Sequence, residues 1–377
     1  MGSQHTDIYI NPQAHSWHHD ANTDRRIRHF HQRLPGFTPT PLIRVDSIAK
    51  ELGLKYVFVK DESHRANLPA FKILGASWAT YRAVTRAVGL STDVSFEVLA
   101  DAASEKVIKI FAATDGNHGR AVARMARILR IQADVFVPSN LEQATRDLIA
   151  GEGARVIVAD GDYDYAVQQA RINSEVPNGI LIQDTAFEGY TEIAQWIVDG
   201  YSTMMIETEE QVREATGGTA DFVIAPAGVG SFAQAVVSYW KSRPYPCSVM
   251  AVEPDSAACL KNSLTKGEPI TIATENTIMA GLNCGTVSSI AWPILQKGVD
   301  ISVSVSDREA HEGVAQFKAL GIHAGPCGTA SYAALKHIAE QHSKDVQSLN
   351  PDSTVVLFCT EGERGYEMLD RKKEGLL

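Results

Sequence analysis

The chain has 377 residues, of which 44% are hydrophobic and 21% are charged, and its formal net charge is −10. This length is too great for one simple core and fits about two domains or one large α/β unit. The acidic balance argues against a sequence-independent nucleic-acid binder, which needs a basic face, and no apolar run reaches the length of a membrane span.

The ends of the chain and its cysteines bear on the compartment. The N-terminus lacks the charged and then apolar plan of a secretory signal. The five cysteines are odd in number and show no CxxC spacing, which predicts reduced thiols with neither a disulfide framework nor a metal site. They are Cys247, Cys259, Cys284, Cys327 and Cys359. These features predict a cytoplasmic protein.

The predicted elements alternate between short apolar runs and helical patterns. Residues 1–36 are polar, rich in His and Arg and weakly periodic, and we expect them to form an arm that packs over the body or a partner subunit. Strands are predicted at 56–59, 109–113, 133–137, 155–159, 180–183, 221–225, 248–252 and 354–358. Helices are predicted at 74–88, 117–129, 141–152, 163–175 and 232–240, and residues 90–106 are predicted to be an acidic, irregular connector.

This alternation predicts the fold class. Short apolar runs that alternate with helices imply βαβ units and parallel sheets covered by helices on both faces. No Pro/Gly/Ser-rich linker separates two halves. We therefore expect an α/β protein with two intertwined domains, each built on an open twisted sheet. Ligands of such sheets bind beyond the carboxyl ends of the strands.

A lysine in an apolar run is the first candidate for chemistry. Lys72 follows Phe71 in the run Asn67-Leu-Pro-Ala-Phe-Lys-Ile-Leu-Gly-Ala76, just before a helical pattern. Desolvation there would lower the pKa of the amine, as a lysine that forms a Schiff base requires. The alternative is an ordinary lysine with a buried stem and its head in solvent.

A glycine-rich segment follows the predicted strand 221–225. In Ala227-Gly-Val-Gly-Ser231 a strand–glycine–helix junction would expose backbone N–H groups and the positive end of a helix dipole, which together form a phosphate cradle. No Gly-Lys-Ser/Thr follows, so the run is not a P-loop, and Ala233 occupies the third glycine position of a dinucleotide fingerprint. A tight turn without a ligand remains the alternative.

Two more polar segments also follow predicted strands. Thr114-Asp-Gly-Asn-His-Gly119 follows strand 109–113, and Thr360-Glu-Gly362 follows strand 354–358. Each could be an ordinary helix N-cap. Together with Lys72 and the glycine segment, they resemble the fold-type II (tryptophan synthase β-like) family of pyridoxal-phosphate (PLP) enzymes. That family includes serine and threonine dehydratases, cysteine synthase and threonine synthase.

The resemblance extends from Thr38 to Thr360 and is greatest to the diaminopropionate ammonia-lyases. The runs that carry it are 67–76, 113–120, 183–190, 226–230, 279–285 and 360–362. It implies PLP as cofactor, bound as an imine on Lys72, with Phe71 shielding the imine from water. It also implies that the phosphate of PLP contacts Ala227, Gly228, Val229, Gly230 and Ser231. The 3′ oxygen of PLP would contact Asn117, and the pyridine nitrogen would contact Thr360.

Two acids and two further residues are implied on the substrate side. Asp115 stands where ordinary dehydratases of the family have a small hydroxyl residue, and a carboxylate there suits an ammonium leaving group. It could also act as a second base, opposite Lys72, so that both enantiomers react. Asp184 is expected near the β-amino group, although it could instead be a strand-end helix cap. Thr114 and His118 complete the predicted substrate site.

The predicted reaction is α,β-elimination of 2,3-diaminopropionate to pyruvate and ammonia. The resemblance implies a large PLP-binding domain (1–75 plus 187–377), a smaller mobile domain (76–186), and a homodimer. No ligand cluster in the sequence demands a metal, and the sequence leaves a cation requirement open. Cys359 before Thr360 and the run His323-Ala-Gly-Pro-Cys-Gly328 depart from the family pattern, which leaves the preferred amino acid open. The alternatives are a serine/threonine dehydratase, a β-replacement synthase, a non-catalytic PLP-fold protein and, last, a nicotinamide-binding enzyme.

Overall fold

The computed structural model describes residues 8–20, 24–342, 344–346 and 348–368. The chain divides into two compact units. Unit 1 comprises residues 1–24, 38–65 and 204–377, and unit 2 comprises residues 25–37 and 66–203. The chain therefore leaves unit 1 and returns to it, as expected for intertwined domains.

Unit 1 is built on a seven-stranded sheet in the order β1-β10-β9-β8-β11-β3-β2. The five central strands are parallel, while β1 and β2 pair antiparallel to β10 and β3 at the two edges. The predicted parallel sheet is thus confirmed at its centre. The strands are β1 (Ile8–Ile10), β2 (Leu42–Arg44), β3 (Tyr56–Asp61), β8 (Phe222–Pro226), β9 (Ser248–Pro254), β10 (Ile301–Val305) and β11 (Thr354–Cys359).

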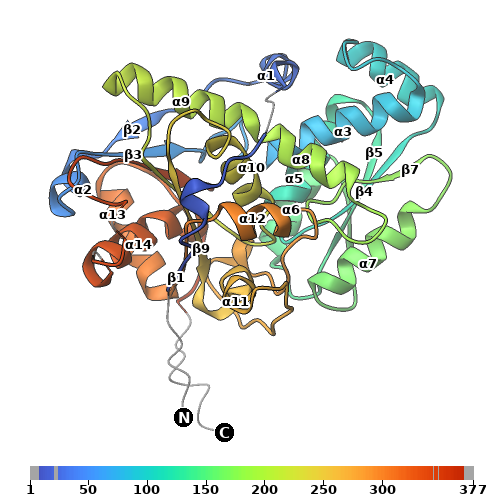
Figure 1. Ribbon diagram of the computed structural model, residues 1–377. Coiled ribbons are helices and arrows are strands. Elements are labelled where there is room, and N and C mark those ends of the chain that lie inside the picture. Colours follow the sequence, from blue (N-terminus) through green and yellow to red (C-terminus); the bar gives the residue numbers. More distant parts are fainter. Residues whose placement is uncertain (1–7, 21–23, 343, 347, 369–377) are drawn as a thin grey trace, which may run out of the picture. The chain divides into compact units, whose positions relative to one another are not determined.

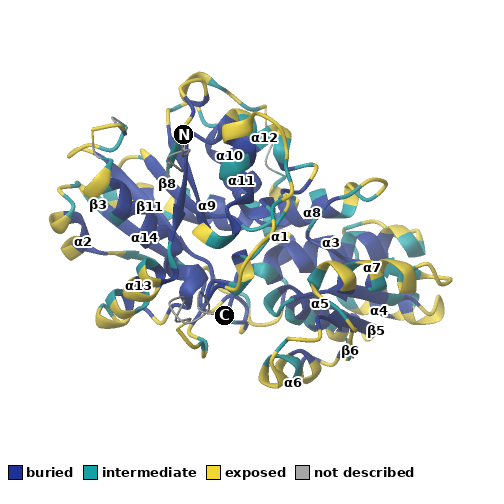
Figure 2. Ribbon diagram, turned by 90° about the horizontal axis from the view of Figure 1, so that it is seen from below, coloured by how far each residue is buried: buried dark blue, intermediate teal, exposed yellow. Residues whose placement is uncertain are grey.

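Both faces of this sheet are covered, which explains why its strands are apolar runs. All residues of β8, β9, β10 and β11 are buried (Figure 2). Leu357 belongs to the core shared with α14, whereas the next residue, Phe358, packs edge-to-face on Phe232 of α10. Alternate residues of β11 therefore bury opposite faces of the sheet.

Among the described residues, six α-helices lie wholly in unit 1, and a seventh, α9, begins two residues before the chain returns to it (Figure 1). They are α2 (Asp46–Glu51), α9 (Ser202–Thr216), α10 (Ser231–Trp240), α11 (Cys259–Lys266), α12 (Trp292–Gly298), α13 (Asp307–Ala319) and α14 (Pro326–Gln341). Short 3₁₀ turns occur at Ala14–Ser16, Asp255–Ala257 and Ala280–Leu282.

Unit 2 is built on a four-stranded parallel sheet in the order β6-β5-β4-β7. Helix α7 packs on a face formed by Phe111, Phe136 and Leu181, and α5 also packs against β4 and β5. The strands are β4 (Lys109–Ala113), β5 (Gln132–Val137), β6 (Arg155–Val158) and β7 (Gly179–Leu181). The helices are α1 (Arg25–Gln32), α3 (Lys72–Val88), α4 (Phe96–Glu105), α5 (Asn117–Ile128), α6 (Gln143–Gly151), α7 (Tyr163–Ser174) and α8 (Glu192–Gly200).

Three local predictions were wrong or incomplete. The predicted irregular connector at 90–106 contains α4, which Ser95 caps by accepting a hydrogen bond from the Val98 amide at 3.2 Å. The weakly periodic segment 1–36 contains β1 and α1, although residues 1–7 and 21–23 lie outside the described part of the chain. Strand β10 was not predicted, because serines interrupt the apolar residues of its alternating Ile-Ser-Val-Ser-Val sequence.

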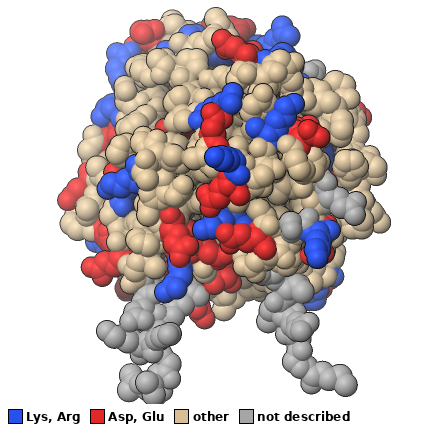
Figure 3. Space-filling view, turned by 90° about the vertical axis from the view of Figure 1, so that its left-hand side faces the viewer, with Lys and Arg blue, Asp and Glu red and all other residues tan. Residues whose placement is uncertain are grey.

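Two surface properties are relevant to partners. On the face shown in Figure 3, basic side chains are interspersed with acidic ones and form no continuous basic surface among the described residues. A helix that combines the length and the apolar character needed to cross a membrane does not occur in the described part of the chain.

Candidate active site

The predicted site residues fall into two groups, one in each unit. Unit 2 holds Phe71, Lys72, Thr114, Asp115, Asn117, His118 and Asp184, and unit 1 holds Ala227, Gly228, Val229, Gly230, Ser231 and Thr360. Each group lies where a strand ends or a helix begins, as the sequence predicts.

In unit 2, Lys72 and Asp184 form an ion pair. Lys72 is the first residue of α3, and its Nζ lies 2.5 Å from Oδ2 of Asp184, which follows β7. The side chain of Lys72 is 22% exposed and that of Asp184 is 7% exposed, so this is a sheltered charge pair with one accessible partner. The lysine Nζ also lies 5.5 Å from the ring centre of Phe71, whose ring packs on Tyr201 at 4.9 Å.

Close packing between α3 and α8 fixes the start of α3. A Cβ atom on Gly75 would lie 2.7 Å from the backbone oxygen of Ile197, and one on Gly200 would lie 2.5 Å from the backbone oxygen of Leu74. Only glycine permits this approach, because real Cβ contacts are longer. The two glycines therefore hold the helix that carries Lys72 directly against its neighbour.

The loop between β4 and α5 is folded around Thr114. Its Oγ1 accepts hydrogen bonds from the amides of Gly116 at 2.8 Å and Gly119 at 3.0 Å. Thr114, and neither Asp115 nor Asn117, therefore satisfies two amides at the start of α5. This leaves the Asp115 carboxylate without that capping role.

His118, on the first turn of α5, lies between a backbone carbonyl and Asp184. Its Nε2 is 2.9 Å from the oxygen of Ile182, and its Nδ1 is 3.8 Å from Oδ2 of Asp184. The imidazole is buried. Lys72, His118 and Asp184 thus form one cluster around a single carboxylate.

The two acids of this group have opposite pKa shifts. Burial, followed by repulsion from Asp184 and Asp164, raises the pKa of Asp115 to about 7. Burial also acts to raise the pKa of Asp184, but the charge of Lys72, the hydrogen bond that Lys72 donates and the neighbouring His118 imidazole together outweigh burial and lower that pKa to about 2. At neutral pH Asp184 is therefore a permanent anion, whereas Asp115 can both give and take a proton.

Two residues that the sequence did not single out position this group. Gln183 is buried and accepts a hydrogen bond from the Ala113 amide at 3.0 Å, which ties the end of β4 to the segment that carries Asp184. The Tyr190 hydroxyl accepts from the Gln183 amide at 2.8 Å and donates to the Leu181 carbonyl at 3.0 Å. Both belong to the run 183–190, but no charge or glycine pattern marks them.

In unit 1, the glycine segment connects β8 to α10. Gly230 is the N-cap of α10 with φ of +92°, a conformation that favours glycine, and it has no side chain with which to cap the helix. A Cβ atom on Gly228 would meet Cys284 Sγ and the Gly281 oxygen, both at 3.1 Å. The segment therefore places a helix N-terminus without a side-chain cap at the end of β8, the arrangement that a phosphate cradle requires, and Gly228 packs closely on residues 281–284.

Thr360 lies directly after β11 and is buried beside the start of α14. Its Oγ1 donates a hydrogen bond to the Cys327 carbonyl at 3.3 Å, and the carboxylate of Glu361 accepts one from the Cys327 amide at 3.1 Å. The run 323–328, which the sequence left unassigned, therefore packs against Thr360. Its glycines are required, since a Cβ atom on Gly325 or Gly328 would lie 2.6 Å from a backbone oxygen of the 361–362 segment.

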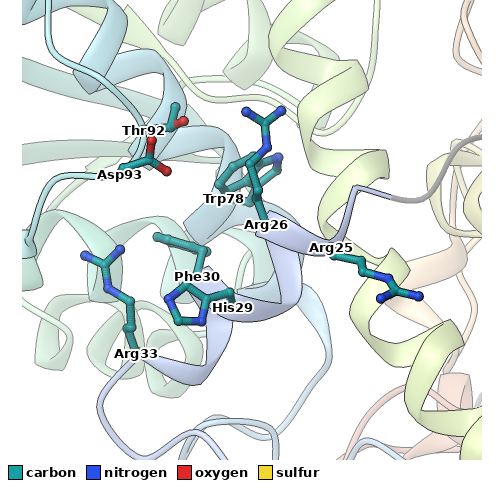
Figure 4. Close-up of a pocket in the computed structure, with 8 residues that line it drawn as sticks. All are labelled: Arg25, Arg26, His29, Phe30, Arg33, Trp78, Thr92 and Asp93. Atoms are coloured by element: carbon teal, nitrogen blue, oxygen red, sulfur yellow. The ribbon is translucent and has the colours of Figure 1, made fainter.

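A separate pocket of about 240 Å³ lies in unit 2 between α1, α3 and the segment before α4 (Figure 4). Three arginines and a histidine surround two aromatic rings in it. Its lining residues are Arg25, Arg26, His29, Phe30, Arg33, Trp78, Thr92 and Asp93. None of the predicted site residues lines this pocket, so it is distinct from the candidate active site.

The residues present fit PLP. A primary amine at the start of a helix suits the aldehyde carbon of the cofactor, and the glycine cradle at α10 suits its phosphate. The buried hydroxyl of Thr360 suits the pyridine nitrogen, and Asn117 carries an amide that can donate to the ring oxygen. The donor set thus matches the chemical groups of this cofactor.

The comparisons with known proteins agree with this assignment. The model of the pyridoxal-phosphate dependent enzyme family matches residues 33–361. Diaminopropionate ammonia-lyase of Escherichia coli K12 is 36% identical over 349 residues, which cover 89% of this chain and 87% of the relative. The protein of the same name from Salmonella typhimurium LT2 is 33% identical over 372 residues, covering 93% and 92%.

A solved structure extends the likeness to three dimensions. The crystal structure of Escherichia coli diaminopropionate ammonia-lyase in complex with an aminoacrylate–PLP azomethine reaction intermediate superposes with a TM-score of 0.83. It is 34% identical and covers 94% of this chain and 93% of its own. The chain therefore belongs to the family of the diaminopropionate ammonia-lyases, within the fold-type II pyridoxal-phosphate-dependent enzymes.

Proposed function

We propose that the protein catalyses the α,β-elimination of 2,3-diaminopropionate to pyruvate and ammonia. The observation that carries this proposal is the pair of acids grouped with Lys72: Asp184, ionised at 2.5 Å from the lysine, and Asp115, with a pKa of about 7. Carboxylates beside the reacting carbons suit a substrate whose leaving group is an ammonium. A hydroxyl substrate such as serine offers them no such charge.

Each cofactor contact is assigned to a residue of the chain. PLP, when bound, withdraws electrons from the Cα atom of a substrate attached through its α-amine. Lys72 would hold the cofactor's aldehyde carbon, with Phe71 beside it. The segment 227–231 would bind the phosphate, Asn117 the ring oxygen and Thr360 the pyridine nitrogen. A neutral hydroxyl at that nitrogen suits an elimination, which needs only modest stabilisation of a carbanion.

The proton transfers are assigned to the unit 2 cluster. Lys72, once released from the cofactor, takes the Cα proton of an L-substrate. Asp115, in its carboxylate form, takes the Cα proton of a D-substrate and pairs with the β-ammonium group. Asp184 forms ion pairs with the cationic groups of the site, and Thr114 and His118 orient the substrate. This division of labour would let both enantiomers react.

The organisation that the resemblance implies belongs to the same proposal. The protein would act as a cytoplasmic homodimer, with a PLP-binding domain of residues 1–75 and 187–377 and a mobile domain of residues 76–186. Light scattering on the purified holoenzyme tests the dimer, because a monomer would scatter as a 41.0 kDa species.

One experiment tests the activity. Purified protein is mixed separately with L- and D-2,3-diaminopropionate, L-serine and L-threonine, and pyruvate or 2-oxobutyrate is followed with a coupled dehydrogenase while the visible cofactor band is recorded. Faster turnover of diaminopropionate than of serine supports the proposal. Preference for serine or threonine would make the protein a dehydratase, and a protein that stays colourless with added PLP would overturn the enzyme assignment.

A further inference from the structure

The hydrogen-bond geometry of His118 fixes its tautomer. Its Nε2 lies 2.9 Å from the carbonyl oxygen of Ile182, and a carbonyl can only accept. The hydrogen of the neutral ring is therefore on Nε2. Nδ1 then carries a lone pair and can only accept a proton.

Nδ1 faces an acceptor with no hydrogen between them. It is buried, makes no hydrogen bond with any described residue, and lies 3.8 Å from Oδ2 of Asp184. A hydrogen bond can form across this gap only when Nδ1 gains a proton. The same carboxylate oxygen already accepts a hydrogen bond from Nζ of Lys72 at 2.5 Å.

This arrangement bears on how Lys72 can act as a base. As an ammonium ion paired with Asp184, Lys72 has no lone pair with which to take a proton. If it loses its proton, the Asp184 carboxylate is left almost buried and without its cation, which is costly. A second cation on the other side of Oδ2 would remove that cost.

We propose that His118 is the proton store of Lys72, neutral while Lys72 is an ammonium ion and protonated on Nδ1 when Lys72 is neutral. One N–H bond breaks on Lys72 Nζ and one forms on His118 Nδ1, with Oδ2 of Asp184 between them, so the summed charge of the three groups stays at zero. The use of this exchange in turnover rests on the proposed function. The exchange itself does not.

The electrostatics of the cluster support the exchange. The charged groups that face His118 are Asp184, from the segment after β7, and Lys72, from the start of α3. Burial lowers the pKa of His118, the charge of Asp184 opposes that effect, and the charge of Lys72 reinforces it. Removing only the lysine charge therefore favours protonation of the imidazole.

Nuclear magnetic resonance on the cofactor-free protein tests this directly. The histidine rings are labelled with ¹⁵N, and the His118 signals are identified by their loss in His118→Gln. In the wild type we expect a neutral ring with its hydrogen on Nε2. In Lys72→Met the midpoint of its titration should rise by one pH unit or more, which is a tenfold or greater gain in proton affinity.

Two matched variants keep the result decisive. Lys72→Arg retains the positive charge and should leave the titration of His118 near that of the wild type. Adding Asp184→Asn to Lys72→Met should abolish the rise, because the attracting anion is gone. Equal midpoints in the wild type, Lys72→Met and Lys72→Arg would overturn the proposal, as would a wild-type ring with its hydrogen on Nδ1.

The outcome is separable from the proposed function. If the wild-type protein does not turn over diaminopropionate but His118 shows the Lys72-dependent titration, the proposed proton store stands and the assigned substrate is wrong. If the protein has full lyase activity but His118 shows no such titration, the assigned substrate is correct and the proposed proton store is wrong.

Discussion

At the scale of single residues, one carboxylate organises the unit 2 cluster. Asp184 keeps its charge because the Lys72 ammonium ion pairs with it, while burial and the nearby charges of Asp184 and Asp164 raise the pKa of Asp115 to about 7. Two chemically identical side chains in one cluster thus acquire different protonation behaviour from their surroundings. Each difference leads to a measurable consequence.

Replacing Lys72 by Ala should remove the cofactor attachment and the base together. We expect the visible band of the bound cofactor to disappear and turnover to fall by roughly 10²–10⁴-fold or more, the range for loss of a positioned acid–base group. Absorbance and the coupled pyruvate assay measure the two effects. Full activity in Lys72→Ala would refute the whole assignment of the site.

Replacing Asp115 by Asn should separate the two enantiomers. We expect turnover of the D-substrate to fall by roughly 10²–10⁴-fold and that of the L-substrate by much less, because Lys72 remains as its base. In the wild type, D-turnover should rise as the pH passes about 7, since only the carboxylate form of Asp115 accepts a proton. That rise should vanish in Asp115→Asn, and equal losses on both enantiomers would exclude the two-base scheme.

At the scale of elements, most strands and helices near the site could be predicted, and the reasons for the misses are physical. Strands β8 and β11 are continuous apolar runs because both of their faces are buried. Strand β10 alternates serine with isoleucine and valine, and nothing in its sequence shows that its serines are enclosed as well. Helix α4 was hidden by its acidic composition, although its Ser95 cap is a readable start signal.

The contacts inside the site were less predictable than its elements. The sequence placed Lys72, Asp115, His118 and Asp184 on loops and helix ends, but it could not show that Asp184 pairs with the lysine. That pairing depends on how the start of α3 and the segment after β7 fold together, because Lys72 and Asp184 are 112 residues apart in the chain. The packing of the 323–328 run against Thr360 is likewise a tertiary contact without a local signal.

The close contact of α3 with α8 gives a prediction about stability. Gly75→Ala should destabilise the protein by about 1–3 kcal/mol, because its Cβ would lie 2.7 Å from both a backbone oxygen and side-chain atoms. Gly151→Ala is the matched control, since it is also helical and its Cβ would meet nothing within 4 Å. The control should be neutral or stabilising by about 0.5–1 kcal/mol.

Urea unfolding of the two variants measures this difference. Both substitutions add the same methyl group to a helical residue of unit 2, Gly75 near the start of α3 and Gly151 at the end of α6, and only the methyl group at position 75 would meet close contacts. If the two variants unfold at the same urea concentration, the contact between α3 and α8 is not as close as the structure indicates.

At the scale of the whole molecule, the chain leaves unit 1 after residue 65 and returns to it at residue 204. A fully buried ion cluster joins these two points within unit 1. Arg65 donates to Glu62 at 2.6 Å and to Glu207 at 2.6 Å, and Lys60 lies 3.1 Å from Glu207. The cluster therefore ties the outgoing segment to the returning segment, so that a long insertion can leave the sheet of unit 1 intact.

Removing the central cation of this cluster should destabilise unit 1. Arg65→Met leaves Glu62 and Glu207 buried with only Lys60 to offset their charges, which we expect to cost about 3–5 kcal/mol. Arg213→Met is the control, because Arg213 is exposed, its partner Glu209 keeps the hydrogen bonds of Tyr239 and Tyr245, and i,i+4 pairs on a helix contribute about 0.3–0.5 kcal/mol. Denaturant unfolding followed by tryptophan fluorescence compares the two variants.

The pH dependence of the same variants tests the electrostatic origin of the loss. Burial acts to raise the pKa of Glu62, but Arg65, together with Lys60 and a hydrogen bond from Thr40, outweighs it, so the folded pKa lies below the ordinary value of 4.5. A carboxyl group with a depressed pKa stabilises the fold above its unfolded pKa, and this contribution is lost as the pH falls through the folded pKa. In Arg65→Met the carboxyl groups lose that cation, so their folded pKa values should rise. Acidification from pH 7 toward pH 5 should then protonate them and reduce the difference in free energy of unfolding between the variant and the wild type. A gap that stays constant over this range would show that Arg65 acts through packing rather than through charge.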